Sequence, residues 1–233
     1  MDVVLVGLPG SGKSVVGRRL AHRHGATFVD LDERIERADG RSIPTIFAED
    51  GETAFRDLER AVIADLGSAD PDPSIVRVIA SGGGAVVDPR NRWVLYRGRA
   101  SVWLDGRPEV LAQRLRRSPN VRPLVAGRDP IGAIRDLAGR RERFYGAATI
   151  RVRGVAEVSG VVATIEERLA TGPDLASTTL LRTTTPIGQV VLGDGIAARG
   201  VDEALRRLDA RRAIIASEPG AWAAVGARIA DGL

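Results

Sequence analysis

The sequence predicts an α/β protein with a central five-stranded parallel sheet and helices on both of its faces. Two observations predict this fold class. Short apolar runs alternate with helical patterns over the first 170 residues, and turn residues rich in glycine separate them. Such alternation is typical of parallel sheets, because a crossover helix must return the chain to the start of the next strand.

The predicted strands are short apolar runs, and the first is a β-branched run that ends at Gly7. We expect strands at Asp2–Val6, Ala26–Asp30, Ile75–Ala80, Ala100–Leu104 and Thr149–Val152. The first predicted helix follows a glycine-rich turn and is closed by Gly25. We expect helices at Lys13–His24, Asp32–Ala38, Ile43–Asp50, Glu52–Leu66, Pro89–Tyr96, Pro108–Arg117, Ile131–Tyr145 and Gly160–Ala170.

Residues 171–186 differ from the chain before them and are expected to be a linker after a first domain of residues 1–170. Seven of these sixteen residues are serine or threonine, and no apolar period is present. Residues 187–233 form a third segment, a short α/β fragment too small to predict an independent core. Its expected elements are a strand at Gly188–Leu192, a helix at Val201–Leu208, a strand at Arg212–Ala216 and a helix from Ala221.

Composition narrows the possible functions. The chain has no cysteine, which excludes disulfides and thiolate metal sites and fits a reducing compartment. No stretch approaches the roughly 18 apolar residues of a membrane span, and the first residues run directly into a strand without a charged leader, so we expect a cytoplasmic protein with no membrane partner. The net charge of +4 is small, so we also expect no nucleic-acid partner. His22 and His24 point in different directions on one helix and are expected on the surface.

One motif carries specific chemistry. The stretch GLPGSGKS, residues 7–14, matches G-x-x-x-x-G-K-[ST] and stands between a predicted strand and a predicted helix. In this motif backbone amides and the helix N-terminus bind phosphate oxygens. Lys13 is the only lysine among 34 basic residues, and its compact ammonium fits between phosphates where a planar guanidinium is too wide. The motif predicts nucleoside triphosphate binding, with the Ser14 hydroxyl on Mg²⁺, and leaves the acceptor open.

Two carboxylates stand at the end of the second predicted strand. Asp30 and Asp32 are two residues apart, and such residues point the same way on an extended chain. One carboxylate can then serve the water shell of a metal ion while the other reaches a substrate hydroxyl. The alternative is a solvated strand end, or an N-cap of the next helix at Asp32.

Further motifs follow in a characteristic order. They are FVDLD at residues 28–32, Phe55-Arg56, SGGGAV at residues 81–86, Val121-Arg122-Pro123-Leu124 and the run from Arg141 to Tyr145. In this order and spacing, residues 1–170 resemble shikimate kinase. The resemblance implies a three-layer fold of the P-loop, nucleoside-monophosphate-kinase-like class. It also implies ATP as donor, Mg²⁺, and phosphorylation of the 3-hydroxyl of shikimate in the biosynthesis of chorismate and aromatic amino acids, with the kinase domain expected to be a monomer.

The resemblance implies roles for residues at matching positions. The residues that would bind ATP are Gly10, Ser11, Gly12, Lys13, Ser14, Val15, Arg117 and Arg122, with Arg116 as an alternative to Arg117 at the adenine. Ser14 would bind the metal ion directly and Asp30 through water. Those for shikimate are Asp32, Arg56, Gly82, Gly83, Gly84 and Arg141, where Arg56 and Arg141 grip the carboxylate. Lys13, Asp32 and Arg122 are the implied catalytic residues, with Asp32 as candidate base and Arg122 as an arginine that closes over the transferring phosphate.

Physical arguments support these roles. An acidic substrate needs fixed cations, and arginine binds a carboxylate through two N–H groups, although a single arginine is more often a solvated helix face. Three successive glycines cost backbone entropy and mark either a close approach to a ligand or a simple tight turn. Prolines and a glycine frame residues 118–129 as a lid that excludes water.

The tail and two alternatives complete the expectations. From Pro186 onward the chain is similar to the opening of 3-dehydroquinate synthase but contains none of that family's metal-binding histidines, so we expect no synthase activity. A fusion of a kinase with the start of a synthase would explain the tail, and a kinase-specific extension packed on the core is the alternative. For the kinase domain, the alternatives are another small-molecule or nucleotide kinase of this fold and a nucleotide-dependent switch.

Overall fold

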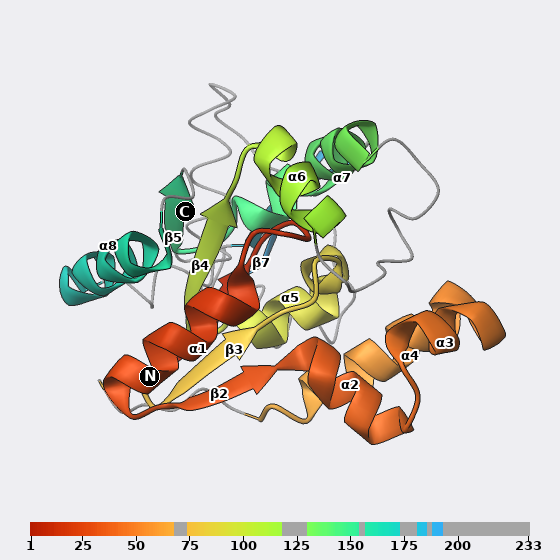
Figure 1. Ribbon diagram of the computed structural model, residues 1–233, viewed down its shortest axis with the longest axis horizontal. Coiled ribbons are helices and arrows are strands. Elements are labelled where there is room, and N and C mark those ends of the chain that lie inside the picture. The colour runs from red at the N-terminus through yellow and green to blue at the C-terminus, as the bar shows by residue number, and fades with distance from the viewer. Residues whose placement is uncertain (68–73, 118–129, 154–156, 173–180, 186–187, 193–233) are drawn as a thin grey trace, which may run out of the picture. The chain divides into compact units, whose positions relative to one another are not determined.

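A parallel sheet of five strands, in the order β2-β3-β1-β4-β5, is the centre of the first unit of the chain (Figure 1). The computed structural model describes residues 1–67, 74–117, 130–153, 157–172, 181–185 and 188–192. The five strands are β1 Asp2–Val6, β2 Thr27–Asp30, β3 Arg77–Ala80, β4 Ala100–Asp105 and β5 Ile150–Arg153. β1 lies in the middle, where Leu5 is opposite Ala80 of β3 and Val102 of β4. All five residues of β1 are buried, as a strand covered on both faces requires.

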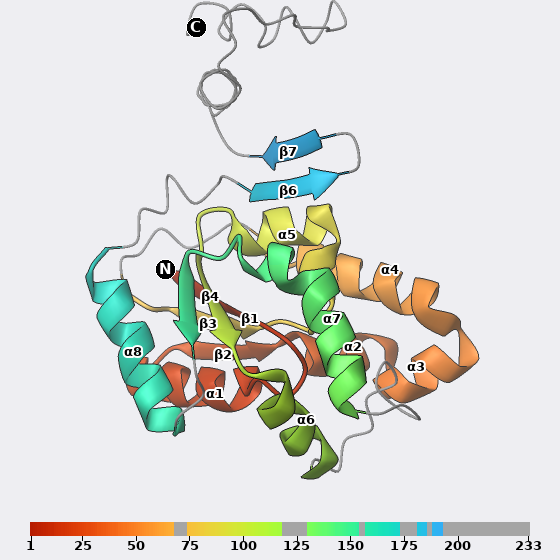
Figure 2. The same cartoon turned by 90° about the horizontal axis from the view of Figure 1, so that it is seen from above.

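Helices connect the strands and cover the sheet. They are α1 Lys13–His24, α2 Leu31–Asp39, α3 Ile43–Glu49, α4 Gly51–Ala64, α5 Pro89–Tyr96, α6 Pro108–Arg117, α7 Pro130–Tyr145 and α8 Val158–Ala170, with a 3₁₀ turn, η1, at Ala85–Val87. α1 and α8 lie on one face of the sheet and α5 on the other (Figure 2). On the α1 and α8 face, Leu20 and Ile165 pack against strand residues such as Val3 and Val102 in one buried cluster.

A buried ionic cluster lies at the end of the sheet where β1 begins. Asp2 has no exposed surface, and both of its carboxylate oxygens bind arginines: Arg77 at Oδ1 and Oδ2, and Arg99 at Oδ2 with a distance of 3.0 Å. Arg99 also donates to the carbonyls of Gly67 and Val94. The buried charges are thus paired and hydrogen-bonded, which burial in a protein interior requires.

The predicted fold class and the order of these elements are confirmed. The bounds of β1, α1, α5 and α6 agree with the predicted ranges, and the other predicted helices and strands of residues 1–170 differ by one or two residues at an end. The 3₁₀ turn after the glycine triplet was not predicted. Among the described residues, no helix is long and apolar enough to cross a membrane. His22 and His24 are exposed, as expected, and His24 lies 3.0 Å from Glu166 of α8.

The chain divides into two units, Met1–Thr178 and Thr179–Leu233. In the second unit, β6 Leu181–Thr185 and β7 Gly188–Leu192 form an antiparallel hairpin with Thr185 opposite Gly188. The strand at Gly188–Leu192 is confirmed, but the prediction of a linker over residues 171–186 is wrong for Leu181–Thr185. Threonine is β-branched and favours strands, and pairing with β7 decides for a strand in this polar stretch. The elements predicted after Leu192 lie outside the described residues.

Candidate functional site

The phosphate loop, residues 7–12 between β1 and α1, surrounds the ammonium group of Lys13. Lys13 Nζ donates to the carbonyls of Gly7 at 2.9 Å and Leu8 at 3.1 Å, and to Ser11 Oγ at 3.4 Å. These acceptors are spread around a compact three-donor group, which suits an ammonium better than a planar fork. The Lys13 side chain therefore folds back toward the phosphate loop, where a phosphate group would bind.

Glycines give this loop its shape and bring it close to α6. Gly10 and Gly12 have φ angles of 81° and 89°, in the left-handed region that side chains disfavour. A Cβ on Gly10 would lie 2.9 Å from the carbonyl oxygen of Leu111 in α6, so no larger residue fits there. Gly12 is the N-cap of α1, and the amides of the first helical turn point toward the loop.

Ser14 and Asp30 form a pair of hard oxygen donors beside the loop. Ser14 Oγ donates to Asp30 Oδ2 at 2.6 Å, and Asp30 is the last residue of β2. The other oxygen of Asp30 accepts the backbone N–H of Asp32 at 3.1 Å. Both oxygens of Asp30 are therefore oriented by the protein, one toward the phosphate loop and one toward the start of α2.

The interpretation of Asp30 and Asp32 as neighbours on one extended strand is wrong. β2 ends at Asp30, which caps α2 with its side chain, and Asp32 lies in the first turn of that helix. The favoured capping role thus belongs to Asp30 and not to Asp32. The chain bends between the two carboxylates, so Asp30 faces Ser14 while Asp32 lies against Gly82.

The glycine triplet after β3 is the point at which the other predicted residues meet. A Cβ on Gly82 would lie 2.9 Å from Asp32 Oδ1, and one on Gly83 would lie 3.0 Å from Pro9 of the phosphate loop. A Cβ on Gly84 would lie 2.7 Å from Arg56 Nη1. These close approaches favour glycine at all three positions, because a side chain would displace a charged group or the phosphate loop.

Arg141 of α7 completes this arrangement from the other side of the turn. Its Nη1 donates to the carbonyl of Gly83 at 2.9 Å, and the hydroxyl of Tyr145 donates to the same oxygen. Arg141 is 8% exposed, so its charge lies at the edge of the protein interior. The turn therefore carries arginines on two sides, Arg56 at Gly84 and Arg141 at Gly83.

The comparisons with known proteins agree with this geometry. The shikimate kinase family model matches residues 9–170. A shikimate kinase of Symbiobacterium thermophilum is 45% identical over 172 residues, which are 72% of this chain and 96% of the relative. The chain belongs to the shikimate kinase family. A shikimate kinase of Caulobacter vibrioides is 49% identical over 150 residues, covering 64% of this chain and 72% of the relative.

Solved structures of the shikimate kinase family share the fold. The shikimate kinase of Acinetobacter baumannii in complex with shikimate is 34% identical with a TM-score of 0.67, and 73% of this chain covers 93% of that chain. The shikimate kinase of Aquifex aeolicus is 32% identical with a TM-score of 0.61, over 73% of this chain and 96% of that chain. The resemblance of residues 1–170 to this family is thereby confirmed, whereas the similarity of the tail to a synthase stays a prediction.

Glu59 is a member of this site that sequence reasoning missed. Its carboxylate is 2% exposed, accepts from Arg56 Nη1 at 2.8 Å and lies near Gly82, where a Cβ would be 3.1 Å from Oε1. Burial raises the pKa of Glu59, and the nearby Asp32 charge raises it further, while Arg56 and Arg141 act in the opposite direction. Its spacing from Arg56 on α4 was the only signal in the sequence, since residues three apart on a helix are neighbours.

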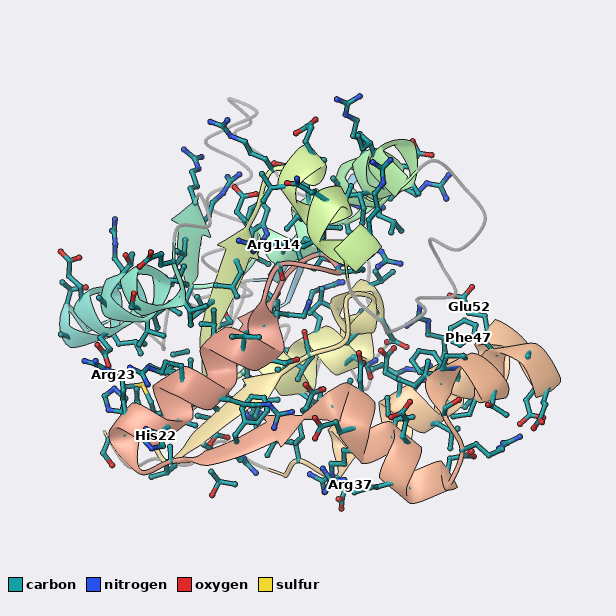
Figure 3. All side chains as sticks on the ribbon, in the orientation of Figure 1. His22, Arg23, Arg37, Phe47, Glu52 and Arg114 are labelled. Atoms are coloured by element: carbon teal, nitrogen blue, oxygen red, sulfur yellow. The ribbon has the colours of Figure 1, made fainter. Side chains whose placement is uncertain are left out.

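Arg56 itself is held by two carboxylates of its own helix. Its Nε and Nη2 donate to Glu52 Oε1 at 3.2 and 2.9 Å, and its Nη1 donates to Glu59. Glu52 is 56% exposed and lies in the first turn of α4 (Figure 3). Burial alone would lower the pKa of Arg56, but the two glutamates outweigh it and raise the pKa. Arg56 is therefore a permanent cation in a fixed place.

For several predicted site residues the structure gives no position, or no contact with the rest of the site. Arg122 and the predicted lid at residues 118–129 lie outside the described residues. Arg117 is the last residue of α6, and Arg116 beside it is exposed. Val15 is 59% exposed at the start of α1. Among the described residues, no group of three or more histidine, cysteine, aspartate or glutamate side chains is arranged to hold a metal ion.

Proposed function

We propose that this protein transfers the γ-phosphoryl group of ATP to the 3-hydroxyl of shikimate. One observation carries the proposal beyond family membership. Gly83 is in contact range of Pro9 in the phosphate loop, its carbonyl accepts from Arg141, and the next residue lies against Arg56. A phosphate-binding loop and two arginines suited to a carboxylate thus meet at one three-residue turn. A small acid held by these arginines would stand beside the terminal phosphate.

On the donor side, the phosphate loop supplies backbone amides, and Lys13 supplies a cation. Backbone N–H groups of Gly10, Ser11 and Gly12 and the N-terminus of α1 would cradle the phosphates. The Lys13 ammonium would exchange its carbonyl partners for phosphate oxygens, since these carry more negative charge than carbonyls. Phosphoryl transfer depends on positioning and charge neutralisation, and both are properties of this loop.

Ser14 and Asp30 are the residues that would hold Mg²⁺. They offer a hydroxyl and a carboxylate 2.6 Å apart, and hard oxygen donors of this kind fit Mg²⁺, which keeps several waters and phosphate oxygens in its shell. When bound, the ion neutralises charge on the phosphates. The orientation of Asp30 by the backbone N–H of Asp32 keeps one carboxylate oxygen directed at Ser14.

On the acceptor side, Arg56 and Arg141 would bind the carboxylate of shikimate and Asp32 would orient its hydroxyl. Guanidinium groups match a carboxylate through paired N–H donors. Asp32 lies at Gly82, in the same turn whose next two glycines lie against Arg141 and Arg56, so it is suited to accept the proton of the attacking hydroxyl. Arg117 at the nucleotide, Arg122 over the transferring phosphate, a monomeric state and a cytoplasmic location remain predictions.

A panel of acceptors tests this function. The protein is incubated with ATP, Mg²⁺ and one acceptor at a time (shikimate, gluconate or a nucleoside monophosphate), and ADP release is followed in a coupled assay. Shikimate is expected to give turnover far above the rate of ATP hydrolysis without acceptor. Turnover with gluconate or a nucleotide and none with shikimate would contradict the proposal and favour another kinase of this fold. Tight binding of nucleic acid without phosphorylation of any acceptor would favour the switch.

Replacing Glu52 with glutamine is expected to lower the KM for shikimate about two- to fivefold, the range of an exposed ion pair. Glu52 occupies two N–H groups of Arg56 in the absence of substrate, and because it is exposed it is the partner that a substrate carboxylate can displace. Steady-state kinetics at saturating ATP measures the effect. Asp57→Asn on the same helix, which removes an exposed ion pair with Arg60, serves as control. An unchanged or higher KM in the Glu52 variant would contradict this competition.

Ending the chain after Gly172 is expected to leave kinase activity within about twofold of the full chain, since a compact domain keeps its own core. α8 closes at Ala170 with Thr171 as its C-cap, and the family model ends at residue 170. The assay with shikimate and a thermal melt of both chains measure the outcome. A large loss of activity or stability would favour the alternative in which the tail is an extension packed on the kinase core.

A further inference from the structure

Tyr145, the last residue of α7, is buried at the edge of the acceptor site. It is 1% exposed, and its ring lies against Trp103 of β4 with ring centroids 6.0 Å apart. The guanidinium of Arg151 lies over Trp103 at 4.0 Å and is itself held by Asp105 at 2.9 Å. Residues of β4 and β5 therefore hold the ring in place, and its position is set by the sheet.

The phenol of Tyr145 and the guanidinium of Arg141 share one acceptor. Both donate to the carbonyl oxygen of Gly83, which has two lone pairs and can accept both. The two donors are four residues apart on α7 and so lie on the same face of the helix. Burial raises the pKa of Tyr145 to about 12, so the phenol is a stable donor at neutral pH. α7 thus grips the glycine turn at a single atom.

That atom has a special place in the site. Its neighbours along the chain lie against Asp32, at Gly82, and against Arg56, at Gly84, and Gly83 itself approaches Pro9 of the phosphate loop. Without side chains, this turn can be fixed only through its backbone, and the carbonyl of Gly83 is the group that α7 holds. A shift of the Gly83 carbonyl would move the guanidinium of Arg141 and the carboxylate of Asp32 relative to the phosphate loop.

We propose that Tyr145 is a positioning residue for the acceptor: its hydroxyl fixes the Gly83 carbonyl, and with it the spacing of Arg141, Arg56 and Asp32 that binds shikimate. The proposal rests on the proposed function. Tyr145 acts through the turn and through its direct interaction with the Arg141 side chain, which lies beside its hydroxyl. One of the five N–H groups of Arg141 donates to the Gly83 carbonyl, and two others would donate to a substrate carboxylate. The phenol keeps the carbonyl in place while the arginine engages the substrate.

The other tyrosine of the chain provides a matched control for Tyr145→Phe. The chain contains two tyrosines, and Tyr96 is also 1% exposed. Its hydroxyl donates to the carbonyl of Phe144 at 3.2 Å, so it anchors the same helix by the same kind of bond without touching the turn. Y145F and Y96F each remove one buried phenol-to-carbonyl hydrogen bond, and similar falls in melting temperature are expected for the two variants.

Steady-state kinetics of the full chain separates positioning from general loosening. Y145F is expected to raise the KM for shikimate about three- to tenfold, the equivalent of one hydrogen bond. The KM for ATP and kcat should stay within about twofold, since the phosphate loop keeps its own contacts. Y96F should leave all three constants within the same limit. An equal rise in the KM for shikimate in both variants, or no rise in Y145F, would overturn the proposal.

A spectroscopic measurement covers the case in which Y145F does not fold. In Y96F, Tyr145 is the only tyrosine, so 3-fluorotyrosine added to the growth medium gives one ¹⁹F resonance. Saturating shikimate is expected to shift this resonance, whereas the same concentration of acetate is not. No shift with shikimate, in protein that turns it over, would overturn the proposal. If the wild-type protein does not phosphorylate shikimate at all, the proposed function fails and the role of Tyr145 fails with it.

Discussion

Replacing Lys13 with arginine is expected to lower kcat for shikimate phosphorylation about 100- to 1,000-fold although the charge is kept. Lys13 Nζ lies 2.9 and 3.1 Å from two carbonyls and 3.4 Å from a hydroxyl of its own loop. A guanidinium is wider and presents its donors in one plane, so it cannot take the place of these bonds or enter the same space between two phosphates. The loss should therefore appear in turnover and in ATP binding.

The control for this substitution is Arg19→Lys on the same helix. Arg19 is exposed on α1, so exchanging its cation tests whether any change of basic residue on this helix matters. The variant is expected to keep the wild-type kcat and melting temperature. Turnover in Lys13→Arg within tenfold of wild type would show that charge alone suffices and that the shape of the group does not explain the single lysine of the chain.

The elements nearest the phosphate loop could be predicted from the sequence because each carries a local signal. β1 is buried on both faces and is rich in valine, and α1 is bounded by Gly12 and Gly25, both with positive φ. The strand Leu181–Thr185 could not be predicted in this way. Its threonines favour strands, but the polar composition around them is typical of a linker, and only pairing with β7 decides between the two.

The site shows the same division between local and distant signals. The phosphate loop is one continuous motif, so its residues could be named from spacing alone. Arg56 and Arg141 could be singled out among the many arginines only through the family resemblance, because what distinguishes them is a turn that lies far away in sequence from both. Glu59 looks like any acidic residue on a helix, and its buried place beside Gly82 and Arg56 cannot be read from its position in the sequence.

The bend between Asp30 and Asp32 has a consequence for how the donor and acceptor sites are separated. On one extended strand both carboxylates would point the same way. In the structure Asp30 caps α2 and faces Ser14, while the backbone N–H of Asp32 is bound by Asp30 and the Asp32 side chain lies at Gly82. One hydrogen bond of 3.1 Å therefore links the proposed metal side of the site to the proposed acceptor side.

Asp32→Asn is expected to lower kcat about 100- to 10,000-fold, the range for loss of a positioned general base. Asparagine has the same shape and can still donate to or accept from a substrate hydroxyl, but its amide cannot take up the proton or supply the negative charge. The backbone bond to Asp30 is kept, so the Ser14–Asp30 pair and ATP binding should not change. The KM for shikimate should change less than kcat, because Arg56 and Arg141 would still hold the carboxylate.

Glu33→Gln is the control for Asp32→Asn, since Glu33 follows directly in the first turn of α2 and pairs with Arg18 and Arg37 on the surface. Both carboxylates lie near the N-terminus of α2, where a negative charge interacts favourably with the helix dipole. Removing either charge is therefore expected to lower the stability of the protein by a similar amount. Similar melting temperatures with a large difference in kcat would therefore assign the loss to proton transfer. If the Asp32 variant kept a kcat within tenfold of wild type, the proton would have to leave by another route, and Glu59, whose pKa is raised and which lies at the same glycine, would be the next carboxylate to replace.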